Sequence, residues 1–440
     1  MAERVLVLGG GLAGVACARQ LGDEGIEVTL VDRNDYHQFQ PLLYQVASSQ
    51  LPAEDIARPH RTIFREYPSV EVVTAQVVAA DLSAHSLTLA DGTTLQGSHL
   101  VIAAGAQPNF FGVPGAAEHA FPLYSVADAE RLRLHLQGLL QAVPDNTASR
   151  EPGSIDVVVV GGGPTGVETT GALAELMLAL QKSGRLTVPG KITLVDLGDA
   201  LLGQFPDKAH EYALEKLTEA GADVRLGVGV TAVHPDRVQF NDGSAISTRT
   251  VVWGGGESAS AIAQTAGPSR GRGGRIDVRP DLSVAGYPRT YAVGDVANIP
   301  SGDDTALPQL GSVAQQSGKW AAENILRELR GKPTEPFVYK DKGIMAMIGR
   351  NAAVAAVGKR HHQVEGPVAF AAWLGVHAML LSGVHSKTDA FLTWAWDYFD
   401  RDHAATIEAT AAAPERLAWA DHGEDMPHIV LDRPTATNAP

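Results

Sequence analysis

The sequence predicts an α/β protein with two Rossmann-like units and a helical C-terminal region. In its 440 residues, a pattern of strand, glycine-rich turn, helix and strand occupies residues 5–32 and returns at residues 155–196. An apolar strand at residues 290–295 ends in Gly-Asp, and we expect a helix at about residues 310–329. Repetition of one βαβ unit is typical of two parallel sheets, and the late strand and helix indicate that the second unit is inserted into the first.

These observations suggest a division into domains. We expect residues 1–115 and 285–330 to form a discontinuous first domain, residues 116–284 an inserted second domain, residues 331–408 a C-terminal region with amphipathic helices, and residues 409–440 a disordered tail.

The first repeat contains the parts that bind an adenine dinucleotide. An apolar strand runs into a glycine turn, a helix begins at Leu12, and a second strand ends in an acid. The glycines permit a tight turn, close approach of a pyrophosphate and close helix packing, while the helix N-terminus offers free N–H groups to the phosphates. The acid can accept hydrogen bonds from a ribose. The residues expected to bind this dinucleotide are Gly9, Gly11, Gly14, Asp32 and the adjacent Arg33.

The stretch between the repeats contains several expected strands. The residues after Asp32 predict a loop of polar and aromatic residues that leads into residues 41–45, and residues 48–54 have no steady period and predict irregular cover over the ligand. Residues 70–97 predict a β-meander that turns at Asp91 and Gly92. A buried strand at residues 99–102 then ends in small residues, and Gly105 would let the backbone pass close to a bound cofactor.

The second repeat predicts a second dinucleotide site. Its glycines are Gly161, Gly163 and Gly166, and Asp196 ends its second strand. One site can hold FAD and the other a nicotinamide dinucleotide. Because Asp196 favours a free ribose hydroxyl and the next residues, LGDALL, include no Arg or Lys for a 2′-phosphate, we expect NADH rather than NADPH.

Three further features of the sequence concern charged residues. Glu168 lies just inside the second-repeat helix, where a carboxylate is favoured by the helix dipole; alternatively it faces the two redox rings, and the sequence favours neither reading. Residues 270–275 form a basic, glycine-rich turn that we expect to be a solvated loop. At the end of the later strand, Gly294 and Asp295 are placed to bind the ribityl hydroxyls of a flavin.

Composition excludes several classes of function. The 35 basic and 50 acidic residues give a net charge of −15, which argues against a nucleic-acid partner and gives no general attraction to anionic lipid. Cys17 is the single cysteine and is expected to be a buried apolar residue, so disulfide reduction or sulfide oxidation through a cysteine pair is not expected. Because the first strand begins by Val5, we expect no signal peptide and a cytoplasmic location.

The chain resembles the two-dinucleotide-fold flavoprotein reductases, and most closely the type II, single-subunit, non-proton-pumping NADH:quinone oxidoreductases. The resemblance runs from Val5 to about Ile407 and rests on VDRNDYHQFQPLLYQVAS, VVVGGGPTGVETTGALAEL, YAVGDVA, LPQLGSVAQQSGKWAAENI and WAWDYFDRD. It implies an FAD-dependent NADH dehydrogenase of the respiratory chain, in which hydride passes from NADH to flavin and two electrons then pass to a quinone.

The resemblance also implies roles for individual residues. Glu168 and Gln316 would be catalytic, and Ser312, Gln315 and Gln316 would lie at the quinone site. FAD would be held by the first glycine set with Asp32, Arg33, Gly294 and Asp295, near Gly105, and NADH by the second glycine set with Glu168 and Asp196. No metal is implied.

The sequence departs from the family pattern in two places. The quinone-site pattern Ala-Gln-x-Ala-x-Gln appears here as GSVAQQ at residues 311–316, so Ser312 replaces the first glutamine. A serine reaches less far toward a quinone carbonyl and leaves room for a different acceptor. The C-terminal residues 385–408 also contain few of the arginines that the family carries on its membrane helices.

The C-terminal region predicts surface attachment rather than a membrane span. Residues 367–384 are nearly free of charge, but 18 residues fall short of the roughly 20 that a spanning helix needs. Residues 389–401 predict an amphipathic helix with an aromatic face, which could lie in a membrane interface, pack on the protein's own core or join a second subunit. We favour peripheral association with the inner face of the cell membrane, and a homodimer is the alternative use of this face.

Two other functions fit the same architecture. A soluble NADH-dependent flavoprotein reductase with a different electron acceptor is favoured by Ser312 and by the weakly basic C-terminus. A flavin-bound redox sensor with little turnover would also carry both dinucleotide sites.

Overall fold

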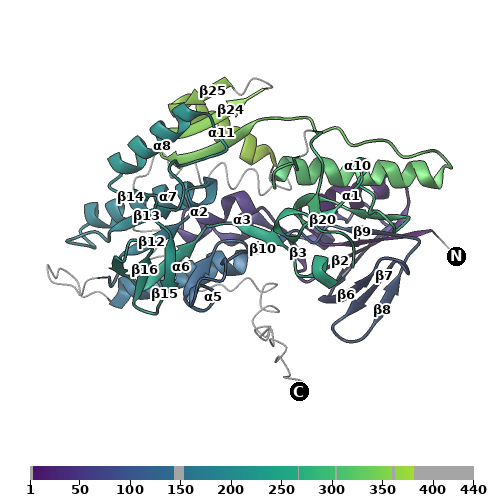
Figure 1. Cartoon of the computed structure of the whole chain (residues 1–440), viewed down its shortest axis with the longest axis horizontal. Helices are drawn as coiled ribbons and strands as arrows, with labels where there is room; N and C mark the ends of the chain where they lie inside the picture. The colour runs from purple at the N-terminus through teal and green to yellow at the C-terminus, as the bar shows by residue number, and fades with distance from the viewer. Residues whose placement is uncertain (1–2, 143–152, 266, 303–304, 359–361, 381–440) are drawn as a thin grey trace, which may run out of the picture.

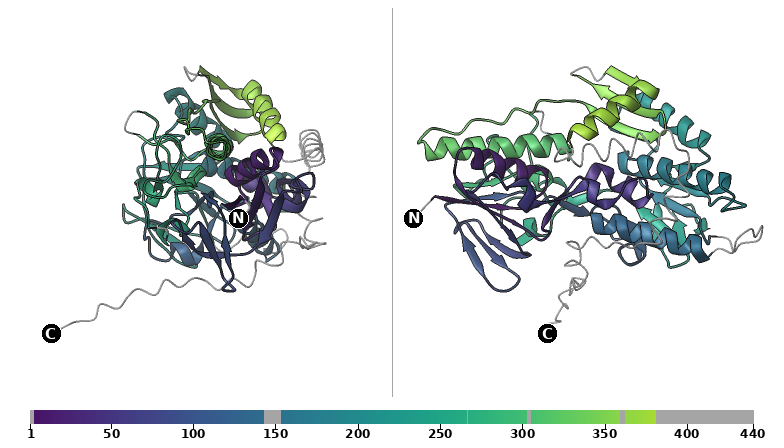
Figure 2. Two further views of the ribbon diagram at one scale, coloured as in Figure 1. Left: turned by 90° about the vertical axis from the view of Figure 1, so that its right-hand side faces the viewer. Right: turned by 180° about the vertical axis from the view of Figure 1, so that it is seen from behind.

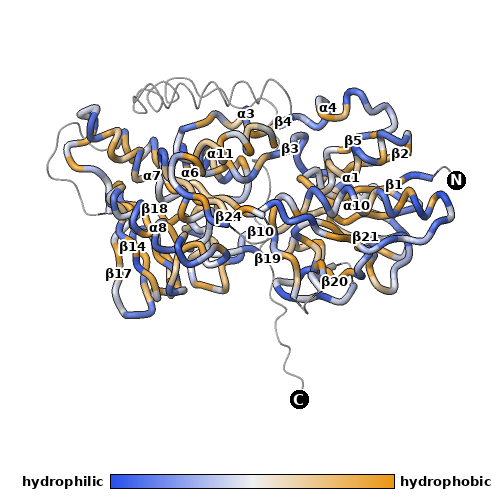
Figure 3. Tube along the Cα trace, turned by 90° about the horizontal axis from the view of Figure 1, so that it is seen from above, coloured by the Kyte–Doolittle hydropathy of each residue, from blue (hydrophilic) through white to orange (hydrophobic). Residues whose placement is uncertain are grey.

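The structure is a computed structural model that describes residues 3–142, 153–265, 267–302, 305–358 and 362–380. Two five-stranded parallel sheets lie at opposite ends of an elongated molecule, with the N-terminus at one end (Figure 1). In Figure 3, hydrophobic colours gather in the interior of the two halves and hydrophilic colours along the outer loops.

The first sheet has the strand order β21-β9-β1-β2-β5. Its members are β1 (Arg4–Leu8), β2 (Glu27–Asp32), β5 (Val70–Thr74), β9 (His99–Ile102) and β21 (Thr290–Ala292). Val7 on the central strand pairs with Leu30 on one side and with Val101 on the other. Strands buried on both faces are continuous apolar runs, which is the pattern of RVLVL and HLVI.

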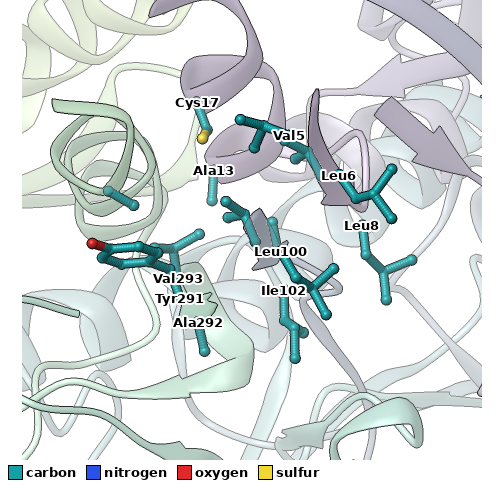
Figure 4. Packing of buried hydrophobic residues seen from close by; sticks show 14 of the residues in the cluster. Val5, Leu6, Leu8, Ala13, Cys17, Leu100, Ile102, Tyr291, Ala292 and Val293 are labelled. Carbon is teal, nitrogen blue, oxygen red and sulfur yellow. The ribbon is translucent and has the colours of Figure 1, made fainter. Parts of the chain in front are cut away.

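Helices α1 (Leu12–Asp23) and α10 (Gly311–Leu329) lie side by side over this sheet (Figure 1). Gly318 permits the close approach, because a Cβ there would be 2.1 Å from the carbonyl oxygen of Ala13. Figure 4 shows the core beneath them, where Cys17 on α1 lies among apolar side chains that include Val5 and Leu100. The expectation that Cys17 is a buried residue is confirmed.

The second sheet repeats the first, with the order β11-β18-β12-β13-β14. Its strands are β11 (Ala120–Pro122), β12 (Val157–Val160), β13 (Ile192–Asp196), β14 (Asp223–Leu226) and β18 (Thr250–Trp253). The helices around it are α6 (Val126–Ala142), α7 (Pro164–Lys182) and α8 (Asp207–Glu219). The predicted α/β class with two Rossmann-like cores is therefore confirmed.

Each sheet is accompanied by a three-stranded antiparallel sheet. The first is β6 (Val77–Asp81), β7 (Ser86–Leu89) and β8 (Thr94–Gln96), and the second is β15 (Val230–Val233), β16 (Arg237–Phe240) and β17 (Ala245–Ser247). The expected meander at residues 70–97 was wrong at its start, because residues 70–74 pair with β2 in the parallel sheet. A β-rich run does not by itself reveal which sheet it joins.

Residues 33–63 contain short elements, although we expected a loop after Asp32 and irregular cover at residues 48–54. They are β3 (Tyr36–Gln38), the 3₁₀ turn η1 (Gln40–Leu42), α2 (Leu43–Ala47), α3 (Ala53–Ile56), β4 (Ala57–Pro59) and α4 (His60–Ile63). All five side chains of α2 are buried, and α2 packs on α6 and α7.

The remaining short elements lie between the strands and helices of the two sheets. They are β10 (Ala106–Pro108), α5 (Ala116–His119), β19 (Glu257–Ala259), α9 (Ile262–Thr265), η2 (Arg272–Gly274), β20 (Ile276–Asp277), η3 (Gly294–Val296) and β22 (Ala297–Asn298). Strands β10 and β19 pair antiparallel, so the residues after β9 and β18 are hydrogen-bonded to each other.

The C-terminal region contains a sheet that the sequence did not predict. Strands β23 (Ile344–Gly349), β24 (Ala352–Val357) and β25 (His362–Glu365) are antiparallel, and α11 (Gly366–Leu380) packs on them. The segment between α10 and β23 runs back over α10 (Figure 2). The predicted amphipathic helix at residues 389–401 and the tail at residues 409–440 lie outside the described residues.

Helix α7 and strand β23 pack backbone to backbone. A Cβ on Gly171 would be 1.7 Å from the carbonyl oxygen of Ile348, so only glycine fits there. Among the helices of the described residues, none is both long enough and apolar enough to span a bilayer.

Candidate functional site

The two glycine turns have the same geometry. Gly9 and Gly161 adopt φ values of +104° and +108°, and a Cβ on either would be 2.3 Å from a carbonyl oxygen of the neighbouring strand end. A Cβ on Gly14 would be 1.7 Å from the oxygen of Gly9, and Gly166 stands in the same relation to Gly161. These contacts give the physical reason for glycine at four of the six predicted positions.

The remaining glycines, Gly11 and Gly163, lie at open helix ends. Each is the N-cap of its helix, neither makes a side-chain cap hydrogen bond, and a Cβ on either would meet nothing within 4 Å. The first turns of α1 and α7 also carry no acidic residue. Free N–H groups at an open, positive helix end fit the pyrophosphate of a dinucleotide.

Asp32 and Asp196 occupy equivalent places at the ends of β2 and β13. One oxygen of Asp32 accepts from the Gly10 N–H, and the other accepts from the Asn34 N–H at 2.7 Å. Asp196 likewise accepts from the N–H groups of Gly162 and Gly198. Each acid therefore fixes its own glycine turn, and each carboxylate oxygen keeps a lone pair for a ribose hydroxyl. Arg33 is exposed beside Asp32.

Asp295 lies in η3 after β21, where Gly294 turns the chain with φ of +69°. Burial raises the pKa of Asp295 to about 6, and the charge of Arg275 opposes that rise. The Arg275 guanidinium donates to the carbonyl oxygen of Leu307 at 3.0 Å. The prediction that residues 270–275 are a solvated loop was wrong for Arg275, which is buried against the later part of the chain.

Close to Gly105 lies Glu257, an acidic residue that the sequence analysis missed; its strand β19 pairs with β10, which follows Gly105. Tyr124 accepts a hydrogen bond from the Ala106 N–H at 2.9 Å, and a Cβ on Gly105 would be 3.1 Å from its hydroxyl oxygen. The surrounding protein, and then the charge of Asp295, raise the pKa of Glu257 to about 7 although its side chain reaches solvent. Burial and the charges of Asp295 and Glu257 also raise the pKa of Tyr124. The signal that could have found Glu257 is its place directly after the second buried strand and three glycines.

Glu168 is buried on α7, beyond the first turn of the helix. Its carboxylate accepts from the Met347 N–H at 3.1 Å, and the indole of Trp373 on α11 lies close enough to oppose a rise in its pKa. Burial outweighs both of these neighbours and raises the pKa of Glu168 to about 8. Tyr44 of α2 also lies close to it, and the pKa of Tyr44 is raised by burial and by the charge of Glu168. Four elements distant in sequence meet at this carboxyl group.

The predicted quinone-site residues lie at the start of α10 and contact the segment that follows this helix. The Ser312 and Tyr339 hydroxyls are 2.8 Å apart. Both ends of the Gln316 amide bond the Lys340 backbone, donating to its oxygen at 3.1 Å and accepting from its N–H at 3.0 Å. Gln315 is half-buried. Glu168 thus lies against β23 and α11, whereas Ser312 and Gln316 lie against residues 339–340.

Residues of α10 hold this returning segment along most of its length. Trp320 and Asn324 donate to the carbonyl oxygen of Glu335 at 2.9 Å each, and Arg327 donates to that of Pro333 at 2.7 Å. In the part of the chain that the structure describes, no group of three or more His, Cys, Asp or Glu side chains could hold a metal ion.

Comparisons with known proteins agree with this architecture. The family model for pyridine nucleotide-disulphide oxidoreductases matches residues 3–318. The chain is 33% identical to the type II NADH:quinone oxidoreductase Ndh of Mycobacterium tuberculosis, over 94% of this chain and 92% of that protein. It is 34% identical to NdhA of the same organism, over 91% and 88%. The structure of NDH2 from Plasmodium falciparum in complex with NADH has the same fold, with a TM-score of 0.81 at 18% identity over 90% of this chain and 98% of that one. The chain therefore belongs to the pyridine nucleotide-disulphide oxidoreductase family and, within it, to the type II NADH:quinone oxidoreductases.

Proposed function

We propose that the protein is an FAD-dependent NADH:quinone oxidoreductase that transfers electrons without pumping protons. The observation that carries this proposal is the pair of open glycine turns, each with an acid at the neighbouring strand end, in a chain similar over nearly its full length to type II enzymes. When bound, FAD accepts hydride from NADH and passes two electrons to the quinone. Cys17 is the single cysteine of the chain, and burial raises its pKa to about 12, so it takes no part.

The two turns divide the binding of the cofactors. The α1 N-terminus with Asp32 and Arg33 binds the FAD pyrophosphate and ribose, while Gly105, Gly294 and Asp295 bind its remaining length. The α7 N-terminus and Asp196 bind NADH in the same manner. Support comes from the equivalent geometry of the turns and from the uncapped N–H groups at Gly11 and Gly163.

Glu168 holds a proton close to the redox site. Reduction of a quinone to a quinol takes up two electrons and two protons. The hydride of NADH supplies both electrons and one proton, and the second proton comes from solvent. A carboxyl group with a pKa of about 8 is protonated at neutral pH and can release that proton when negative charge develops nearby. This supports a catalytic role for Glu168 over a role in satisfying the helix dipole.

The acceptor is bound at the start of α10, by Ser312, Gln315 and Gln316. This helix packs on η3, and Ser317 on its first turns accepts from the Gly294 N–H at 3.1 Å, so the acceptor residues adjoin the proposed flavin-binding turn. A quinone that bonds Ser312 or Gln316 must compete with Tyr339 and Lys340 for the same polar atoms.

We also propose peripheral association with the inner face of the cell membrane. Helix α11 carries no charged residue and exposes Val368, Val376 and Leu380 by 42–69%. An uncharged apolar face of this kind can enter the headgroup region of a membrane. A homodimer joined through the same face is the alternative, and sedimentation of the purified protein without lipid distinguishes the two. Protease accessibility in inside-out and right-side-out vesicles tests which side of the membrane the protein occupies.

The reaction is tested by rapid mixing of the purified flavoprotein, first with NADH and then with a short-chain quinone. Gln316→Leu should slow reoxidation of the flavin by quinone about tenfold while leaving its reduction by NADH unchanged, because one hydrogen-bond partner of the acceptor is lost. An equal loss in both half-reactions would remove Gln316 from the acceptor site. Fast reduction with slow reoxidation by every quinone would favour the second candidate, a soluble reductase with another acceptor, which the engagement of Ser312 by Tyr339 already favours.

A further inference from the structure

Two buried histidines meet at one carbonyl oxygen in the first glycine turn. Nδ1 of His37, on β3, is 2.9 Å from the Gly10 oxygen, and Nε2 of His60, at the start of α4, is 3.2 Å from it. Their side chains are 4% and 0% exposed. His37 comes from the stretch that the sequence predicted to be a polar loop, and His60 follows the stretch predicted to be irregular cover.

The chemistry of the contact fixes the form of both rings. A carbonyl oxygen only accepts hydrogen bonds, so His37 carries its hydrogen on Nδ1 and His60 carries one on Nε2. The oxygen has two lone pairs, and the two histidines use both. The Gly10 N–H donates to Asp32, so side chains hold this residue through both of its backbone polar groups. Gly10 also makes room for the ring, because a Cβ there would be 2.3 Å from Nε2 of His60.

Fixing the Gly10 oxygen also fixes the N–H of Gly11. The two groups belong to one planar peptide unit, so the direction of the oxygen sets the direction of the N–H. Donors on the oxygen polarise the peptide unit and strengthen its N–H as a donor. That N–H lies at the open, uncapped end of α1, where the dinucleotide pyrophosphate is expected.

In the second glycine turn, a backbone N–H rather than a histidine donates to the equivalent carbonyl oxygen. Its equivalent carbonyl oxygen, on Gly162, accepts from the backbone N–H of Leu202 at 2.7 Å, and its N–H donates to Asp196. The two turns share glycines, acid and helix but differ in the donors to this oxygen. Side-chain control of the peptide unit is therefore a feature of the first turn.

We propose that His37 and His60 are positioning residues for FAD: together they hold the Gly10–Gly11 peptide unit so that its N–H meets the pyrophosphate. The proposal rests on the proposed function only in assigning FAD to the first turn, and it is independent of the acceptor.

The test uses amide side chains that either reproduce or misplace each donor. Asn presents an N–H near the place of Nδ1, and Gln presents one near the place of Nε2. His37→Asn and His60→Gln should therefore keep most of the affinity for FAD, whereas His37→Gln, His60→Asn and the leucine variants should each weaken it about fivefold, as loss of one ordinary hydrogen bond does. Affinity is measured by the fluorescence of FAD titrated into the deflavinated full-length chain.

Two further readouts separate positioning from general stability. The ³¹P resonances of bound FAD should shift in the misplaced-donor variants and stay in place in the matched ones. His99→Leu is the control, because His99 is 1% exposed at the opposite end of the same sheet, with its ring 3.3 Å from Glu328. It should lower the melting temperature while leaving the FAD affinity unchanged, and NADH affinity should be unchanged in every variant.

Several results would overturn the proposal. Equal FAD affinity in matched and misplaced amide variants would do so, because the position of the donor would then be irrelevant. An equal loss of FAD affinity in His99→Leu would reduce the effect to stability. Failure of the unaltered chain to bind FAD at all would instead contradict the proposed function. If the unaltered chain binds FAD and NADH bleaches the bound flavin, the proposed function stands, and any defect of the histidine variants then concerns the histidines alone.

Discussion

Glu168 is the residue whose ionisation should change the stability of the protein most visibly. Its pKa is about 8 in the folded chain and 4.5 in its ordinary state, because burial disfavours the charge. The unfolded chain therefore loses this proton as pH rises through about 4.5, while the folded chain keeps it until about 8, so stability falls across that window. The whole fall amounts to roughly 5 kcal/mol as an upper bound.

Glu168→Gln removes this titration while keeping the shape of the protonated side chain. Compared with the unaltered protein, we expect the variant to lose less stability between pH 5 and pH 8. Denaturant unfolding at several pH values measures the difference, and parallel stability curves for the two proteins would show that Glu168 does not titrate in this range. Reoxidation of the flavin by quinone should slow, because the amide has no proton to release.

Asp196 should set the preference for NADH. Asp196→Ala removes both the ribose acceptor and the bonds to the Gly162 and Gly198 N–H groups, so we expect NADH to bind about tenfold more weakly, as for loss of a charge-assisted hydrogen bond. Loss of the carboxylate also removes its repulsion of a 2′-phosphate. The ratio of NADH to NADPH affinity should therefore fall, and an unchanged ratio would count against the assignment.

Contacts between elements explain which parts of the molecule the sequence could predict. Both glycine turns and their acids were predictable because each βαβ unit is local, and four of the six glycines avoid a close contact within that unit or with the strand beside it. The environment of Glu168 was not, because Met347 and Trp373 lie about 180 residues or more away in sequence. Likewise, β5 and β6 follow each other in one β-rich run but join different sheets, a choice that depends on pairing with β2.

The packing of α7 on β23 depends on Gly171. In Gly171→Ala, the added Cβ would meet the oxygen of Ile348 at 1.7 Å, so the strand must move away from the helix and from Glu168. We expect a loss of about 1–3 kcal/mol in the free energy of unfolding, the usual cost of overpacking. Chemical denaturation provides the measurement.

Gly138→Ala in α6 is the matched control for this substitution. It is also a glycine inside a helix, but a Cβ there would meet nothing within 4 Å. Alanine favours helix by about 1 kcal/mol over glycine, so this variant should be slightly more stable than the unaltered chain. Similar losses in both variants would show that the contact with Ile348 is not the cause.

At the scale of the whole molecule, α11 joins the buried carboxylate to the surface. Trp373 on its inner face adjoins Glu168, while Val368 and Val376 on its outer face are exposed. The ring of His377 stacks on Trp373 with centroids 3.9 Å apart and also meets Phe39 edge-on at 6.0 Å. One helix therefore packs against the residues around Glu168 and presents an uncharged face outward.

This arrangement predicts that a charge on the outer face of α11 weakens membrane binding without disturbing the flavin site. Val368→Glu places a carboxylate at a position that is 69% exposed, where the folded protein tolerates it but a lipid interface does not. Co-flotation with vesicles should fall at least several-fold, while reduction of the flavin by NADH stays unchanged. Leu134→Glu is the control, because Leu134 is also exposed on a helix, by 54%, but lies on α6. If both variants float as the unaltered protein does, α11 is not the contact with the membrane. If Val368→Glu instead separates a dimer in lipid-free solution, its outer face joins two copies of the chain, and quinone must reach α10 by another surface.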